Sequence, residues 1–439
     1  MTPTTLRSLA LVGFLVAAIM GRAQPVLGPT ASDTPLVPSS LRAEKKASMF
    51  ALPGGEAENE APLHWGPVDI KPHLLDRFIY SDGLLAVPGH PTNTYINTLS
   101  LGALFDIGRH WTFDYTPSWI IYTNKNFQNS IDHSLRFAGG AELSDWLLQF
   151  SEGYSRTNTP LIETGRQTRQ EVSATSLGAS HAFNNHLSLD VTVAQTLQFI
   201  EKSPDYYDWS NQDWLTYKPG KRVDFSLGLR IGYTDFDPGA YMTYSEPEVR
   251  VRWRAGDKVV FNLEAGREHR QIHKHGIPAQ DTPTLNAVIE YQPFEHTSIS
   301  LKANRSVTPS YSTNSVAENR GWGIDVDQRF FGRFNLTAGY SSGTAHYVGS
   351  HTEFIPSFTD TEGVDSDGNV ITITTVTFTP TTVVDLRNDS IRTLHLRLGT
   401  SFLKRGTIAL VYERNRNISD IAGFSFTSHQ MGCEVGYSF

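Results

Sequence analysis

The segment FSFTSHQMGCEVGYSF, residues 424–439, decides the fold, because its side chains alternate in polarity along an extended chain. Successive side chains of a β-strand point to opposite faces of the sheet. Ser, Gly, Glu and Gln side chains occupy one face. The other face carries apolar and aromatic residues, namely Met431, Cys433, Val435, Tyr437 and Phe439. This pattern predicts a strand with lipid on one side and water on the other, as in a membrane β-barrel.

The same alternation recurs through the chain. In residues 223–233, Val, Phe, Leu, Leu, Ile and Tyr alternate with Asp, Ser, Gly, Arg and Gly, and residues 285–291 and 394–402 behave alike. A soluble β-sandwich is the rival fold, but its strands are usually only about five or six residues long. The longer alternating segments here favour an all-β, antiparallel, up-and-down transmembrane barrel.

Two kinds of connection separate these segments, and they alternate along the chain. The short turns are at residues 108–110, 144–145, 184–185, 218–221, 256–257, 295–296, 332–333 and 404–406. The longer polar connections are at residues 82–91, 125–130, 157–167, 202–205, 235–239, 271–281, 310–317, 348–382 and 417–423. The alternation predicts about eighteen strands, with sixteen as the alternative, since bacterial barrels have even strand numbers. The segment 209–217 has the weakest pattern and is counted because the alternation of turns requires it.

The N-terminal region predicts export. Residues 1–23 have Arg7 near the start, an apolar core at residues 9–20 and Ala23 at a small-residue cleavage site, as in a signal peptide. Residues 24–64 are rich in Pro, Ala, Ser and Glu and predict a flexible periplasmic leader. Residues 65–439 then form the barrel. The chain lacks the run of about 18 apolar residues that a membrane helix requires.

The composition agrees with a barrel. Only 39% of the residues are hydrophobic, which suffices for a wall that is apolar at alternate positions. The net charge of −8 argues against a nucleic-acid partner. The single cysteine excludes an internal disulfide framework.

The chain also resembles a known class of proteins. Aromatic residues flank the short turns, and a second set lies about eight to ten residues away, as in the two girdles of a membrane barrel. With the ending Val435-Gly436-Tyr437-Ser438-Phe439, the chain resembles Gram-negative outer-membrane β-barrels, and more narrowly the β-barrel porin-like proteins. The resemblance implies a location in the outer membrane, surrounded by its lipid. It also implies that Met431, Cys433, Val435, Tyr437 and Phe439 form the signal read by the barrel-assembly machinery.

Charged residues are expected to line the lumen, because an outward Arg near the membrane midplane costs roughly 2–4 kcal/mol. Opposed charges would screen solutes by charge and polarity. Alternatively, they would form ion pairs that merely fill the lumen and stiffen the wall. The predicted pore-lining residues are Arg230, Arg250, Arg252, Arg254, Glu264, Glu290, Asp325, Asp327, Arg329 and Arg397.

Three other features remain open from the sequence. The connection 348–382 contains β-branched residues that predict a β-hairpin, either constricting the pore or extending outward. Its segment 365–369 reads as a polar turn rather than a calcium loop. The aromatic group Tyr206, Tyr207, Trp209, Trp214 and Tyr217 reads either as a sugar-stacking track or as an external collar.

No metal site or cofactor is predicted. His269, His273 and His275 lie together, but no Cys or carboxylate obviously completes a zinc site of four ligands. The sequence has no nucleophile elbow, His-Glu-x-x-His motif or phosphate-binding loop. The absence of these motifs argues against an enzyme.

The function expected is passive diffusion of small polar solutes through a charged lumen. The alternatives are a barrel for polysaccharide export or envelope scaffolding, with the leader docking a periplasmic partner, and, less favoured, an outer-membrane hydrolase. A homo-oligomer is left open, because its contacts would lie on the lipid face.

Overall fold

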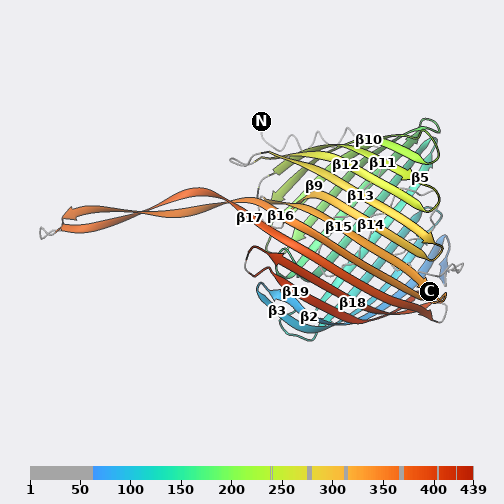
Figure 1. Ribbon diagram of the computed structural model, residues 1–439, viewed down its shortest axis with the longest axis horizontal. Coiled ribbons are helices and arrows are strands. Elements are labelled where there is room, and N and C mark those ends of the chain that lie inside the picture. Colours follow the sequence, from blue (N-terminus) through green and yellow to red (C-terminus); the bar gives the residue numbers. More distant parts are fainter. Residues whose placement is uncertain are drawn as a thin grey trace.

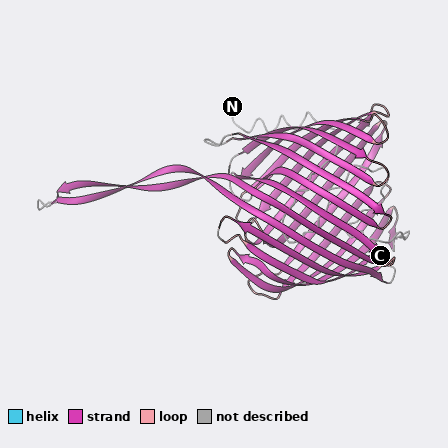
Figure 2. Cartoon of the chain, viewed as in Figure 1, coloured by secondary structure: helices cyan, strands magenta, loops and turns pink. Residues whose placement is uncertain are grey.

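The chain forms a closed antiparallel β-barrel (Figure 1). This computed structural model describes residues 63–237, 239, 241–273, 279–310, 315–364, 370–402, 405–421 and 423–438. The predicted signal peptide, most of the predicted leader and Phe439 lie outside these residues. Within them the structure has one 19-stranded sheet and no helix that could cross a membrane (Figure 2).

Eighteen long strands build the wall, which confirms the predicted number. The first strand, β1 (Leu63–Trp65), is a stub of 3 residues. The wall strands are β2 (Val68–Val87), β3 (His90–Ile107), β4 (Trp111–Tyr122), β5 (Ser130–Leu143), β6 (Trp146–Leu161), β7 (Arg166–Ala182), β8 (Leu187–Ile200), β9 (Asp205–Tyr217), β10 (Val223–Asp237), β11 (Tyr241–Arg254), β12 (Val259–Ile272), β13 (Gln280–Phe294), β14 (Thr297–Pro309), β15 (Ser315–Phe330), β16 (Phe334–Val364), β17 (Val370–Phe402), β18 (Gly406–Ser419) and β19 (Phe426–Ser438). The weakly patterned segment 209–217 is therefore a true strand, β9.

The ring closes where β19 pairs with β2, from His429 opposite Asp82 to Ser438 opposite His73. The stub β1 pairs with the start of β2, at Val68–Ile70, on the side that β19 occupies farther along. It therefore continues the wall beyond the end of β19. Every wall strand has two antiparallel neighbours, so the sheet has no long free edge within the ring.

The two faces of the wall differ as the alternation predicts. On β10, Leu227 is 66% exposed on the outside, whereas its neighbour Ser226 is 5% exposed on the inside. Similar exposed aliphatic and aromatic side chains occur on most strands of the ring, while many buried side chains are polar or charged. This is the reverse of a water-soluble protein and matches a wall with an apolar exterior.

The short connections all lie at one end of the barrel, here called the turn end, and the β2–β3, β4–β5 and similar connections lie at the opposite loop end. Glycines with positive φ, such as Gly108 (61°) and Gly332 (67°), permit tight turns at the turn end. The expected loop 82–91 is much shorter than predicted, because β2 and β3 continue as a hairpin to Val87 and His90.

The expected connection 348–382 is also mostly strand. β16 and β17 remain paired out to Val364 opposite Val370. In contrast, β15 pairs with β16 only as far as Gly349, and β18 pairs with β17 only as far as Asp389. The resulting two-stranded ribbon projects far from the loop end of the barrel (Figure 1). Residues 365–369 lie outside the described part of the chain. Of the two alternatives for this segment, extension away from the lumen is the one the fold adopts.

Candidate functional site

The connection between β6 and β7 folds into the barrel and reaches the wall on another side. The guanidinium of Arg387, on β17, donates hydrogen bonds to the backbone carbonyls of Glu163 (2.7 Å) and Ile162 (3.3 Å). Along the ring, β6 and β17 are separated by β2–β5 and by β18 and β19. The end of the β6–β7 hairpin, which β5 and β8 no longer flank beyond Arg156 and Gln170, therefore crosses the loop end of the lumen.

Arg387 is held firmly in this position. It lies on the inner face of β17 together with Asp389, whose carboxylate accepts hydrogen bonds from Nε (3.0 Å) and Nη2 (2.5 Å). The guanidinium also stacks over the ring of Phe424, at 3.8 Å from its centroid. Asp389 is only 1% exposed, so this ion pair is buried and depends on all of its hydrogen bonds.

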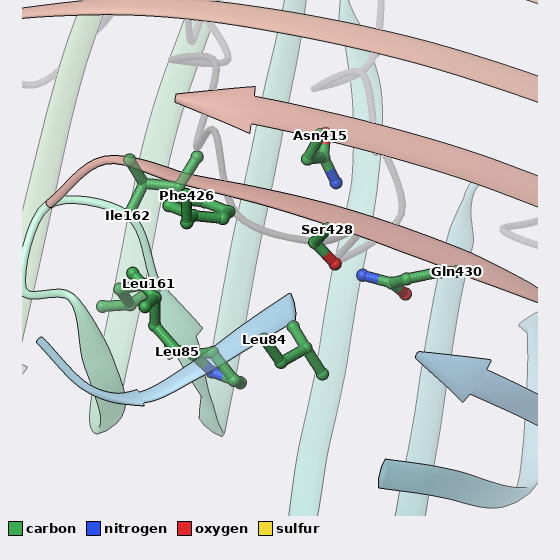
Figure 3. Close-up of a pocket in the computed structure, with 9 residues that line it drawn as sticks. Leu84, Leu85, Leu161, Ile162, Asn415, Phe426, Ser428 and Gln430 are labelled. Atoms are coloured by element: carbon green, nitrogen blue, oxygen red, sulfur yellow. The ribbon is translucent and has the colours of Figure 1, made fainter. Parts of the chain in front are cut away.

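Apolar contacts fix the connection against the wall. Ile162 packs with Ile391 and Ala345 in one buried cluster, with Phe426 beside it. Figure 3 shows Leu161 and Ile162 facing the inner surface formed by β2 and β19. On that surface Ser428 is buried, and its hydroxyl has no hydrogen-bond partner among the described residues. The hydrophobic side chains of the connection thus pack on a mixed surface, where Leu84, Leu85 and Phe426 lie beside Asn415, Ser428 and Gln430.

A second segment meets the first inside the lumen. The pairing of β13 with β14 ends at Arg305, so the end of β14 leaves the wall. Val307 and Val316 from the β14–β15 hairpin join a buried cluster with Met242 and Ile272 from β11 and β12. At the end of this hairpin, the Ser310 hydroxyl donates a hydrogen bond of 2.5 Å to the Glu163 carboxylate. We call Ile162, Glu163, Ser310, Arg387 and Asp389 the constriction.

Four of the predicted pore-lining residues form ion pairs or stacks. Arg230 binds the carboxylates of Glu246 (2.7 Å) and Glu268 (2.9 Å), and both carboxylates are fully buried. The other three make comparable contacts: Arg397 pairs with Glu434 at 3.1 Å, Asp325 pairs with Lys302 at 2.9 Å, and Arg250 stacks over Trp214 at 4.2 Å. At Arg230, Arg397 and Asp325, oppositely charged groups therefore neutralise the lumen charge locally.

The remaining pore-lining candidates lie nearer the turn end, except Glu264, which is level with Arg250. Arg252 and Arg254 are exposed and have no ion pair among the described residues. Their register places Arg252 opposite Asp224 on β10, and it places Glu264 opposite Arg250. The other three are an exposed Glu290, Asp327, which accepts a hydrogen bond from Thr337, and Arg329, which donates to the carbonyl of Gly332.

The aromatic group does not form one surface. Tyr206 and Trp214 face inward and are buried, whereas Trp209 and Tyr217 are exposed on the outside, with Tyr207 on the same face. Neither a continuous sugar-stacking track nor a complete external collar is present. Alternation of β9 explains the division.

The histidines and the C-terminal segment are positioned as follows. His269 contacts Asp281 (3.2 Å) and His273 contacts Thr243 (2.9 Å), while His275 lies outside the described residues. No group of metal-binding side chains occurs among the residues that the structure describes. On β19, Met431 and Val435 are exposed on the outer face, which Cys433 and Tyr437 share by register.

Sequence reasoning missed the constriction. The inward parity of Arg387 and Asp389 was a usable signal, because they share a face with His395 and Arg397. Nothing local indicated that the partners would be backbone carbonyls from β6–β7. Glu246 and Glu268 were likewise on the inward face of their strands and escaped notice.

Comparisons with known proteins show that the fold is similar to that of solved outer-membrane proteins. No protein-family model and no curated protein matches the chain. Among solved structures, it is similar to the outer membrane protein OpdK from Pseudomonas aeruginosa, with 13% identity over 84% of this chain and 98% of that chain and a TM-score of 0.44. Pseudomonas aeruginosa OpdL is 12% identical over 85% of this chain and 99% of that chain, with a TM-score of 0.44. Acinetobacter baumannii OccAB3 is 11% identical over 84% of this chain and 100% of that chain, with a TM-score of 0.43. The functional proposal rests on the geometry instead.

Proposed function

We propose that this protein is an outer-membrane channel through which small polar solutes diffuse passively. The observation that carries the proposal is a closed ring of 18 strands with an apolar exterior and a polar, charged interior. Such a wall is stable only with lipid outside and water or polar groups inside. No chemical step is required of any residue.

The constriction supports a selective rather than an open pore. The β6–β7 connection divides the lumen near the loop end, and Glu163 is held by Ser310 while Arg387 is held by Asp389. A solute must pass beside the constriction before it reaches the exposed Arg252 and Arg254 near the turn end. We infer that the constriction limits solute size and that the charges of Arg252 and Arg254 bias which ions enter.

Single-channel recording in planar lipid bilayers tests this proposal. The purified full-length protein is expected to produce discrete, long-lived conductance steps with a small ohmic current. Liposomes that contain it should swell in an isosmotic solution of a small sugar, but not in one of a large dextran. A folded protein that gives neither steps nor swelling would contradict the channel and would favour export or scaffolding.

A further inference from the structure

Three arginines face outward from the barrel without a counter-charge. Arg392 on β17 and Arg414 and Arg416 on β18 are all exposed. They share a face with Leu398 and Leu410, which are 44% and 62% exposed on the apolar exterior. None of the three has an ion pair among the residues that the structure describes, although other outward arginines do.

Their arrangement is unfavourable unless an anion is bound. Arg392 lies directly opposite Arg416 in the antiparallel register, and Arg414 lies two residues along the same face. Like charges placed directly opposite one another destabilise a sheet. Elsewhere on the loop-end exterior, Arg320 and Arg305 share the carboxylate of Glu318, and Arg267 lies 3.5 Å from Asp281.

The position of these arginines along the barrel axis indicates that the anion is a lipid phosphate. Leu394 and Tyr412 come next toward the turn end on β17 and β18. On the two preceding strands, Tyr340 is in register with Leu394 and Trp322 is in register with Ser342 and Arg392, and the two rings pack 5.5 Å apart. Aromatic side chains collect at the boundary between lipid tails and headgroups. The arginines therefore lie at the level of the headgroups, where they can reach phosphate.

We propose that Arg392, Arg414 and Arg416 form a binding site for a phosphorylated lipid headgroup of the leaflet around the loop end. Arginine presents a planar fork of donors that matches phosphate oxygens in bidentate geometry. Two or more closely spaced phosphates on one headgroup would bridge Arg392 and Arg416 and remove their mutual repulsion. The site rests on the proposed membrane location of the barrel, but not on its conducting solutes.

Native mass spectrometry of the full-length protein in detergent, titrated with bisphosphorylated lipid A, tests the site. The triple variant R392Q/R414Q/R416Q should bind at least about tenfold more weakly, because charge-assisted contacts to phosphate are lost. The matched control R267Q/R305Q/R320Q removes three outward arginines that already have carboxylate partners. It should bind lipid A as the wild type does.

Two further arms sharpen the outcome. Millimolar inorganic phosphate should not displace the lipid, because it lacks the acyl chains and the linked phosphates. Heat-modifiable migration on gels verifies that each variant is folded. Equal lipid A binding by the folded test triple and the wild type, or equal loss in the control triple, would overturn the site.

The same variants separate this inference from the channel. In bilayers of pure phosphatidylcholine, the test triple should conduct as the wild type does, because its arginines face away from the lumen. A wild type that binds lipid A but never conducts would refute the channel and leave the lipid site standing. A wild type that conducts but binds lipid A no better than the test triple would refute the lipid site and leave the channel standing.

Discussion

At the scale of single residues, Arg387 connects the wall to the segment that crosses the lumen. Its guanidinium joins the carbonyls of Ile162 and Glu163 to the buried carboxylate of Asp389. Because water is largely absent around Asp389, removing one partner leaves the other unsatisfied. Function and stability are therefore linked at this residue.

We predict that Arg387→Gln widens the constriction. The β6–β7 connection loses hydrogen bonds, so single-channel conductance should rise and become noisier. The orphaned Asp389 should lower the free energy of unfolding by about 1–3 kcal/mol. Recordings in planar bilayers measure the conductance, and urea-induced unfolding of the protein from lipid vesicles measures the free energy of unfolding.

The double variant R387Q/D389N separates these effects. It removes the orphaned charge, so stability should partly return while the larger conductance remains. The outward Arg416→Gln serves as the control and should conduct normally. Unchanged or reduced conductance in both Arg387 variants would contradict the role of this residue in the constriction.

At the scale of elements, two features depend on strand pairing: the seam between β19 and β2, and the ribbon formed by β16 and β17. At the seam, Gly432 lies opposite Ile79. A Cβ atom at position 432 would run into the backbone carbonyl oxygen of Phe78. The absence of a side chain at Gly432 is thus a condition for closing the ring.

We predict that Gly432→Val impairs closure. The added side chain must push β19 away from β2, and overpacking of this kind typically costs about 1–3 kcal/mol. The fraction of protein with heat-modifiable mobility should fall sharply. Gly153→Val is the matched control, because a Cβ there meets no atom within 4 Å and the barrel should fold normally.

The ribbon should be dispensable for conduction. Replacing residues 350–384 by Asn-Gly joins Gly349 to Asp385, which face each other in the register, through a favoured two-residue turn. Because the ribbon projects from the rim, the shortened barrel should fold and show wild-type conductance (Figure 1). A folded deletion variant with an altered conductance would indicate that the ribbon acts on the pore.

At the scale of the whole molecule, ring closure brings together charges from distant parts of the chain. Arg77 near the start and Arg397 near the end both bind Glu434. Arg252 and Arg254, in contrast, keep exposed positive charge near the turn end. The lumen therefore combines paired charges that stiffen the wall with unpaired ones that act on passing ions.

We predict that R250Q/R252Q/R254Q shifts ion selectivity toward cations. Removing three positive charges from the inner face lowers the local potential for anions. The reversal potential in a salt gradient should move accordingly, and the shift should shrink at high ionic strength because of screening. The outward triple R267Q/R305Q/R320Q loses the same charge and should give a much smaller shift.

The sequence by itself determined the wall. Alternation on strands such as β10 and β19 specified which face meets lipid, and the alternation of short and long connections predicted about eighteen strands, with sixteen as the alternative. Both signals are local, because polarity at neighbouring positions directly decides which way a strand can face. Extended strands and turn chemistry depend on residues within a few positions of one another.

Only the tertiary structure decided how the lumen is filled. The contact between Arg387 and the β6–β7 connection joins residues more than two hundred positions apart, with no shared sequence pattern. The partners of Arg230 and Arg397 were equally hidden. The sequence predicted a hairpin at residues 348–382 but left open whether it constricts the pore or extends beyond the rim. These features depend on which segments the closed ring brings face to face, and periodicity within one strand carries no information about that.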